Sequence, residues 1–197
     1  PVKKKECAAR PIPLYDLKRL LAHLQDNDKQ LFLACMFQYY CFIRPGNELR
    51  SIRIKDINFY SGQIRIGQMD AKNGDTEVVD MPDQLLDLCI NVYQLPHFNP
   101  EFYVFGNKQT PGPDKYGQNT LRNRFNRHRD ELGLPDIYKF YSLKHSGAGI
   151  LLESGATMVE VMDQLRHKEL NTTHHYIKRH FGNRSQHIKK KFPNPLL

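Results

Sequence analysis

The sequence lacks any apolar run long enough to cross a membrane, because no segment approaches the roughly 18 uninterrupted apolar residues of a transmembrane helix. Its first residues show no cleavable signal pattern, since the basic residues at positions 3–5 are not followed by an apolar stretch. Its four cysteines form no CxxC pair, which argues against a zinc module or a disulfide framework and fits a reducing cytosol. We therefore expect a cytoplasmic protein that has no membrane partner.

The sequence also has no excess of acidic residues; basic residues are in excess, and they are distributed unevenly along the chain. The 197 residues carry a formal net charge of +8, with 40% hydrophobic and 25% charged residues, values typical of a globular chain of one or two domains. Residues 1–137 hold 19 basic and 17 acidic side chains, whereas residues 138–197 hold 10 and 4, together with six of the nine histidines. A basic C-terminal third predicts an anionic partner, of which nucleic acid is one candidate.

Hydrophobic spacing predicts helices near the start of the chain. After residues 1–12, which have the composition of a basic linker or tail, leucines from Pro13 to Leu24 recur on one helical face. Residues 30–42 are nearly all apolar, which predicts a helix buried in the centre of the core. Residues 47–54 predict a short helix that leads out of it.

A period of two replaces the helical period between residues 56 and 81. Strands are predicted over residues 56–59, 63–67 and 76–81, with turns at Ser61-Gly62 and Asn73-Gly74, because tight hairpin turns need positive φ. The predicted fold class is therefore mainly α with a small three-stranded antiparallel sheet. A loop is predicted over residues 106–116. Further helices are predicted over residues 82–93, 117–132, 142–154, 157–165 and 171–180.

Reactive side chains gather on the last three predicted helices. Tyr176 lies nine residues after His167, across a short turn, so the two can converge on one site. A tyrosine flanked by cations can attack phosphorus, since cations lower the cost of the phenolate and of pentacoordinate charge. The alternative is a core tyrosine on a solvated basic helix. The adjacent pair His174-His175 favours no metal site, because neighbouring helical positions point about 100° apart, and we expect neither a metal nor another cofactor.

Five motifs in order resemble the catalytic domain of the tyrosine recombinases, the phage integrase family, from about Pro13 to Tyr176. This resemblance makes residues 13–180 the expected catalytic domain and residues 181–197 a C-terminal tail. The motifs are residues 42–49 around Arg44, residues 71–74 around Lys72, residues 141–146, residues 165–167 and residues 172–176.

The resemblance implies a reaction as well as a fold. Tyr176 would attack the scissile DNA phosphate, form a 3′-phosphotyrosine and release a 5′-hydroxyl. Arg44 would hold the non-bridging oxygens with its planar fork. Lys72 would protonate the leaving 5′ oxygen, and His167 would contact the phosphate or orient the tyrosine. The phosphotyrosine stores the bond energy, so the reaction implies neither ATP nor a metal.

Two departures from the family pattern fall in the implied site itself. Tyr141 stands where the family usually has histidine, and Lys144 stands where it has a second arginine. Lysine keeps the positive charge but loses the bidentate fork, while tyrosine donates a hydrogen bond without a positive charge. Either Lys144 is a weakened version of the arginine, or the site has adapted around it. We favour an adapted site, because both departures fall in one motif.

The departures leave three functions open. The first is an integrase or recombinase of a phage or mobile element, hence bacterial or phage-encoded. The second is a DNA-binding protein that keeps the fold without catalysis. The third is a type IB topoisomerase, which shares the tyrosine chemistry.

Double-stranded DNA is the expected partner, together with self-association on DNA through the C-terminal tail. Basic residues near both termini would add affinity that depends on salt rather than on DNA sequence. Around the helix over residues 117–132, Arg122 and Arg129 share one face and Arg124 and Arg127 the opposite one. One pair or the other is therefore expected to reach the phosphate backbone.

Overall fold

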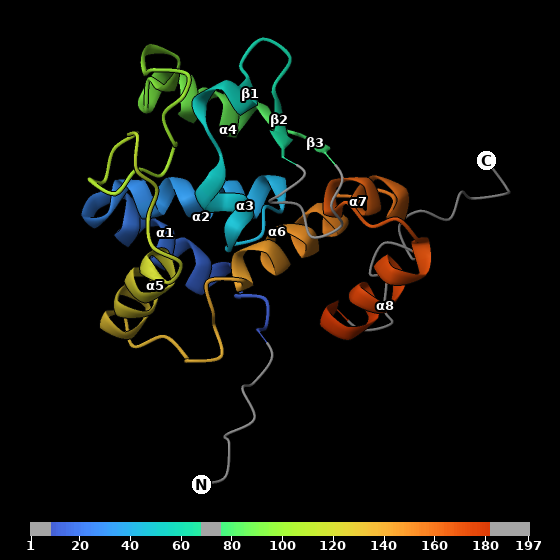
Figure 1. The fold of residues 1–197 in the computed structure, drawn as a ribbon. Coiled ribbons are helices and arrows are strands. Elements are labelled where there is room, and N and C mark those ends of the chain that lie inside the picture. The colour runs from blue at the N-terminus through green and yellow to red at the C-terminus, as the bar shows by residue number, and fades with distance from the viewer. Residues whose placement is uncertain (1–8, 68–75, 182–197) are drawn as a thin grey trace, which may run out of the picture.

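The computed structural model describes residues 9–67 and 76–181, and its helices surround one central helix (Figure 1). That helix is α2 (Lys29–Cys41), which packs against α1 (Leu14–Asn27), α6 (Ser142–Glu153) and α5 (Thr120–Glu131). Residues Leu31 to Phe37 of α2 are all buried, as the apolar run predicts. Gly147 lets the backbones of α6 and α2 come into contact, because a Cβ at this position would lie 1.9 Å from the Tyr39 carbonyl oxygen.

The small sheet follows α3 (Asn47–Ser51) and a single 3₁₀ turn (Ile54–Asp56). Its strands β1 (Ile57–Asn58), β2 (Gln63–Ile66) and β3 (Glu77–Asp80) form the predicted antiparallel meander in the order β1-β2-β3. Ile64 pairs with both Ile57 and Val79, which places apolar side chains on the core face of the sheet. Ile66 pairs with Glu77, so the β2–β3 connection leaves the sheet beside Glu77. Residues 68–75, which include Lys72 and the predicted Asn73-Gly74 turn, lie outside the described residues.

The segment after the sheet departs most from the predicted elements. The helix predicted over residues 82–93 begins as α4 (Asp83–Asp87) but continues as one π-helical turn (Leu88–Val92), and a 3₁₀ turn (Leu95–His97) follows. The predicted loop over residues 106–116 folds back through isolated bridges, one of which pairs Tyr103 with Gly112.

The C-terminal helices form a smaller unit beside α2, at the right of Figure 1. Helix α7 (Met158–Leu165) begins at a capping box in which Thr157 and Glu160 exchange hydrogen bonds, and α8 (Leu170–Phe181) follows after a short turn. Phe42, Ala148, Val161 and Leu165 form a second buried cluster there. No helix in the described part of the chain is both long enough and apolar enough to span a membrane.

Candidate functional site

Segments far apart in the chain meet at one buried carboxylate, that of Glu48 on α3. The Arg44 backbone N–H donates to Glu48 Oε2 at 2.9 Å, and the Arg44 guanidinium donates to Oε1. Arg166 Nη2 donates to Glu48 Oε2 at 2.7 Å. Only 2% of the Glu48 side chain is exposed, so its charge is balanced by two guanidinium groups instead of water.

Arg166 is a candidate site residue that the sequence prediction did not include. It lies in the turn after α7 with a φ of +59°, and its Nε is 2.9 Å from Glu77 Oε2 at the start of β3. Its Nη1 is buried and has no hydrogen-bond partner among the described residues. Its place next to His167 and the loss of an arginine at position 144 were the sequence signals that could have pointed to it.

Lys144 lies on α6 beneath the two guanidinium groups. Its Nζ donates to the Phe42 carbonyl oxygen at 2.8 Å, and the residue is 2% exposed. Phe42 ends α2 in the left-handed region, at a φ of +51°. Burial lowers the pKa of Lys144 well below its usual value, and the charges of Arg166 and Arg44 lower it further. Lys144 therefore fixes the turn that carries Arg44 and is a poorer source of positive charge than an arginine.

Tyr141 lies beside Arg44, at the position that precedes α6. Burial raises the pKa of the Tyr141 phenol, while the positive charge of Arg44 acts in the opposite direction. Its ring centroid is 5.0 Å from that of His145. Tyr141 thus connects the cationic cluster of Arg44, Lys144 and Arg166 to the aromatic side chains of α6 and α8.

The Tyr176 hydroxyl and the His145 Nδ1 share a hydrogen bond of 2.6 Å. The His145 ring also stacks on His180 at a centroid distance of 4.0 Å. Burial raises the pKa of Tyr176, and the nearby Tyr141 phenol adds to the effect. Burial, together with the charges of His180 and Lys144, lowers the pKa of His145 to about 3. At neutral pH the pair is therefore a protonated phenol and a neutral imidazole.

The structure brings most of the predicted site residues together. His167 Nδ1 is 2.9 Å from Thr173 Oγ1, and its ring centroid is 6.0 Å from that of Tyr176. His167 follows Arg166 directly, so it links the cationic cluster to Tyr176. Lys72 is outside the described residues. His174 and His175 are exposed, with ring centroids 5.9 Å apart.

Two of the four arginines of α5 are bound within the fold and two are exposed, and this division does not follow the two predicted faces. Arg124 is committed to the fold, since its Nε donates to Asp28 Oδ2 at 2.8 Å. Arg129 is buried and donates to the backbone oxygen of Tyr138 at 3.2 Å. Arg122 and Arg127 are exposed. Each predicted pair therefore keeps one exposed arginine, because Arg124 is bound to the distant Asp28 and Arg129 is buried against the turn after α5.

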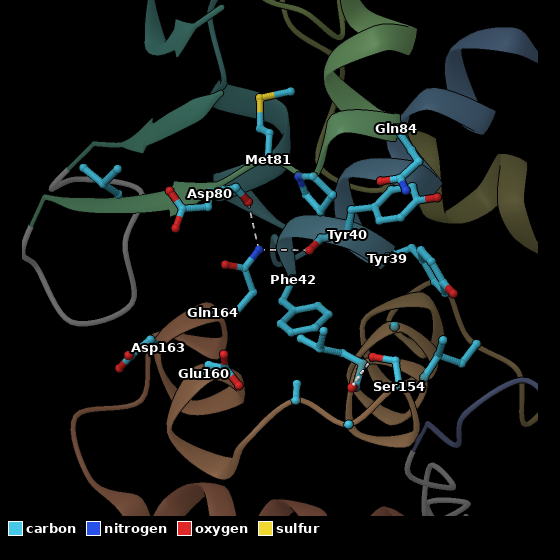
Figure 2. A pocket seen from close by; sticks show the side chains of 17 residues that line it. Tyr39, Tyr40, Phe42, Asp80, Met81, Gln84, Ser154, Glu160, Asp163 and Gln164 are labelled. Carbon is cyan, nitrogen blue, oxygen red and sulfur yellow. Dashed lines mark hydrogen bonds between the residues drawn. The ribbon is translucent and has the colours of Figure 1, made fainter. Parts of the chain in front are cut away.

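A cavity of about 910 Å³ adjoins this site between α2, β3, α6 and α7 (Figure 2). Gln164 lines the cavity and joins two of its walls, because its Nε2 donates to the backbone oxygens of Tyr40 at 3.0 Å and Asp80 at 2.9 Å. Its lining is apolar in large part, and the acidic side chains are those of Asp80, Glu160 and Asp163.

Known proteins share both the sequence pattern and the fold. The model of the phage integrase family matches residues 12–182. A tyrosine recombinase of Pseudothermotoga lettingae is 24% identical over 162 residues, which cover 82% of this chain and 54% of that protein. The chain thus spans about half the length of this curated relative.

Two solved structures show the same architecture at low identity. The crystal structure of the XerA recombinase matches 95% of this chain and 67% of its own, with a TM-score of 0.71 and 16% identity. The Tn1549 transposon integrase in complex with a circular intermediate DNA matches 89% of this chain and 63% of its own, with a TM-score of 0.71 and 12% identity. The fold is that of a tyrosine recombinase catalytic domain, and the chain belongs to the phage integrase family.

Proposed function

We propose that this chain is the catalytic domain of a site-specific recombinase that cleaves and rejoins DNA through a 3′-phosphotyrosine at Tyr176. One observation carries the proposal: a buried cationic cluster, in which Arg166 Nη1 has no hydrogen-bond partner among the described residues, contacts Tyr141, and Tyr141 packs on the His145 ring that bonds to Tyr176. A phosphate oxygen would satisfy that donor, and buried donors without partners are costly. Family membership supports recombination as the process, and the Tn1549 integrase neighbour is described in complex with DNA.

The two guanidinium groups have different roles in this proposal. The Arg44 side chain is 20% exposed and that of Arg166 is 3% exposed, although both pair with Glu48. Arg44 can therefore turn toward a scissile phosphate, and we infer that this movement uncovers the buried Nη1 of Arg166, which Glu48 and Glu77 hold in place. Guanidinium groups suit this task because their planar fork matches two phosphate oxygens.

Tyr176 must lose its proton as its oxygen bonds to phosphorus. His145 is neutral and within hydrogen-bond distance, so it can accept that proton. Its depressed pKa makes it a weak base in the free protein, and the negative charge of a bound phosphate would raise that pKa.

Lys72 would protonate the leaving 5′ oxygen. The strand that follows it begins at Glu77, which contacts Arg166, so five residues of chain, at most about 17 Å, separate Lys72 from the cluster.

Lys144 and Tyr141 are parts of an adapted site in this proposal. The Lys144 amine already bonds to the Phe42 carbonyl in a buried position, where a longer guanidinium would be crowded. The planar guanidinium group that position 144 lacks is supplied instead by Arg166, which lies in the α7–α8 turn. The same cluster would hold a phosphate equally well in a protein that only binds DNA or in a type IB topoisomerase. A covalent DNA adduct distinguishes the two enzymes from the binding protein, and strand exchange distinguishes the recombinase from the topoisomerase.

Self-association through the C-terminal tail has a matching acceptor in the cavity of Figure 2. The tail carries three lysines at positions 189–191, followed by Phe192 and the Leu196-Leu197 pair. The cavity combines an apolar lining with Asp80, Glu160 and Asp163, so both its charge and its polarity complement the tail. We propose that the tail of one copy occupies the cavity of a neighbouring copy on DNA.

The exposed Arg122 and Arg127 of α5 are the proposed phosphate contacts outside the site.

Replacement of the nucleophile tests the central proposal. Tyr176→Phe should abolish covalent adducts on nicked duplexes randomised around the nick, while DNA affinity changes by less than about threefold, because only the attacking oxygen is lost. Tyr60→Phe is the matched control, since Tyr60 is fully exposed. Adduct formation that persists in Tyr176→Phe would assign the nucleophile elsewhere. Adducts with plasmid relaxation but no strand exchange would indicate a topoisomerase.

Conservative exchanges test the two cation positions. Arg166→Lys should lower the single-turnover cleavage rate about a hundredfold, because one preorganised donor to developing charge is lost. Lys144→Arg should change the rate by less than about threefold, since the guanidinium position is already filled. Arg19→Lys on α1 is the control, and melting temperatures identify any unfolded variant. A gain of about tenfold or more in Lys144→Arg would refute the adapted site.

The neutral state of His145 makes stability depend on pH. The unfolded residue binds a proton near its ordinary pKa of 6.5, whereas the folded residue stays neutral to about pH 3, so stability present above pH 6.5 is lost as the pH falls. Between pH 7 and pH 5 the free energy of unfolding should fall by about 1–2 kcal/mol more in the wild type than in His145→Gln. Urea unfolding at both pH values measures this difference. His97→Gln, at an exposed histidine, should keep the wild-type dependence.

Charge reversal at the cavity tests the tail interaction. Asp163→Lys should raise the dissociation constant for self-association by about threefold or more, since the lysines of the tail lose an acidic partner. Sedimentation equilibrium of the full chain in the presence of duplex DNA gives this constant. The control reverses Asp87, which lies outside the cavity. Equal association of the charge-reversed protein and the wild type would show that the tail binds elsewhere.

A further inference from the structure

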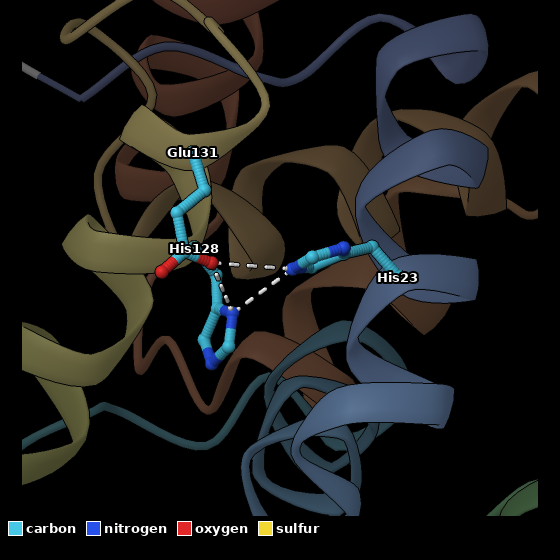
Figure 3. Close-up of side chains that lie close together, drawn as sticks. All are labelled: His23, His128 and Glu131. Atoms are coloured by element: carbon cyan, nitrogen blue, oxygen red, sulfur yellow. Dashed lines mark hydrogen bonds and ion pairs between the residues drawn. The ribbon is translucent and has the colours of Figure 1, made fainter.

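Helices α1 and α5 bring three potential metal ligands together (Figure 3). His23 lies one turn before the end of α1, and His128 and Glu131 lie on successive turns of α5. His128 is buried, with 4% of its side chain exposed, whereas the His23 and Glu131 side chains are 24% and 48% exposed. The group therefore joins a buried ligand to two that solvent can reach.

The three donor atoms form a small triangle. His23 Nε2 is 3.0 Å from His128 Nδ1, His128 Nδ1 is 3.1 Å from Glu131 Oε2, and His23 Nε2 is 3.5 Å from that same oxygen. A tetrahedral zinc ion with ligands at about 2.0–2.1 Å has ligand-to-ligand distances of about 3.3–3.4 Å. The observed edges lie on both sides of this value, so the triangle has the size of one face of a zinc tetrahedron.

The groups around the triangle orient it for a cation. His128 Nε2 is 3.4 Å from both Asp28 Oδ2 and Arg127 Nη2. Arg124 fixes the Asp28 carboxylate with a hydrogen bond of 2.8 Å to the same oxygen. A carboxylate behind a ligating imidazole holds the proton on the distant nitrogen and turns the other lone pair toward the metal. Arg127 Nε is 3.6 Å from Glu131 Oε1, so it pairs with the oxygen that faces away from the histidines.

We propose that His23, His128 and Glu131 bind a zinc-class divalent ion that clamps α1 to α5. Two imidazoles and one carboxylate in tetrahedral geometry favour zinc or cobalt, whereas calcium and magnesium require mainly oxygen ligands. The fourth position opens toward solvent and takes a water molecule. None of the three residues belongs to the cationic cluster or the Tyr176 site, so this proposal does not rest on the proposed recombinase chemistry.

The test is zinc titration of the full chain after treatment with a chelator. Calorimetry should show one tight zinc ion per chain, and cobalt should give the intense visible absorption of a tetrahedral complex. At a zinc concentration about a hundred times the dissociation constant, the unfolding equilibrium constant should fall about a hundredfold. His23→Gln and Glu131→Gln should each weaken binding by at least about tenfold. Both residues are partly exposed, so these variants should fold, and the melting temperature of the chelated protein verifies this.

Surface histidines elsewhere provide the control. The double variant His174→Gln, His175→Gln removes an exposed adjacent pair and should leave zinc affinity unchanged. The proposal is overturned if the wild type binds no zinc more tightly than about 100 μM. It is also overturned if binding survives intact in His23→Gln and Glu131→Gln, or if it is lost only in the His174 and His175 double variant.

Discussion

The pairing of Glu48 with two guanidinium groups is the interaction on which the rest of the site depends. A carboxylate with 2% exposure cannot rely on water, and a buried charge without partners would cost several kcal/mol. Arg44 and Arg166 come from turns 122 positions apart, so the carboxylate joins the α2–α3 turn to the α7–α8 turn. Glu77 extends the same network to β3 through Arg166. The site is therefore assembled by charge pairing between segments that share no local structure.

This network explains how position 144 can lack an arginine. An arginine there would have to share a buried space with two guanidinium groups, and three cations would face the carboxylates of Glu48 and Glu77. A lysine whose pKa is lowered by burial reduces that repulsion, and its amine still holds the Phe42 carbonyl. Arg166 adopts a left-handed backbone conformation that costs a non-glycine residue about 1–2 kcal/mol. Its ion pairs with Glu48 and Glu77 offset that cost.

Patterns with a short range in the sequence predicted the fold well. The apolar run of α2, the leucine spacing of α1 and the three-stranded meander all lie where periodicity placed them, because each depends on residues within a few positions of one another. The π-helical turn at Leu88–Val92 was not predicted, because the helical spacing of apolar residues does not distinguish a π-helical turn from an α-helical one. Spacing predicted that His167 and Tyr176 converge, whereas their grouping with Arg44, Tyr141 and Lys144 came from the resemblance to a family.

What the sequence could not show is which charged groups meet. Helical spacing assigned the arginines of α5 to two faces, yet Arg124 is bound to Asp28, which is 96 positions away. His23 and His128 are separated by 105 positions and form no motif of the CxxC or HxxxH kind. Contacts of this range depend on how α1 and α5 pack against α2, and that packing is set by apolar side chains that carry no chemistry.

In the proposed mechanism, the free protein holds Tyr176 in a resting state. Tyr176 is protonated, its hydroxyl is engaged by a neutral imidazole, and the cations that could stabilise a phenolate are paired with Glu48 and Glu77. The guanidinium charges and the two carboxylates balance, so little net positive charge acts on the phenol. A phosphate that draws Arg44 away from Glu48 would alter this balance, because the guanidinium would then neutralise the scissile group. In this scheme the electrostatic change that activates Tyr176 is supplied by the DNA itself, which would confine phenolate chemistry to the bound complex.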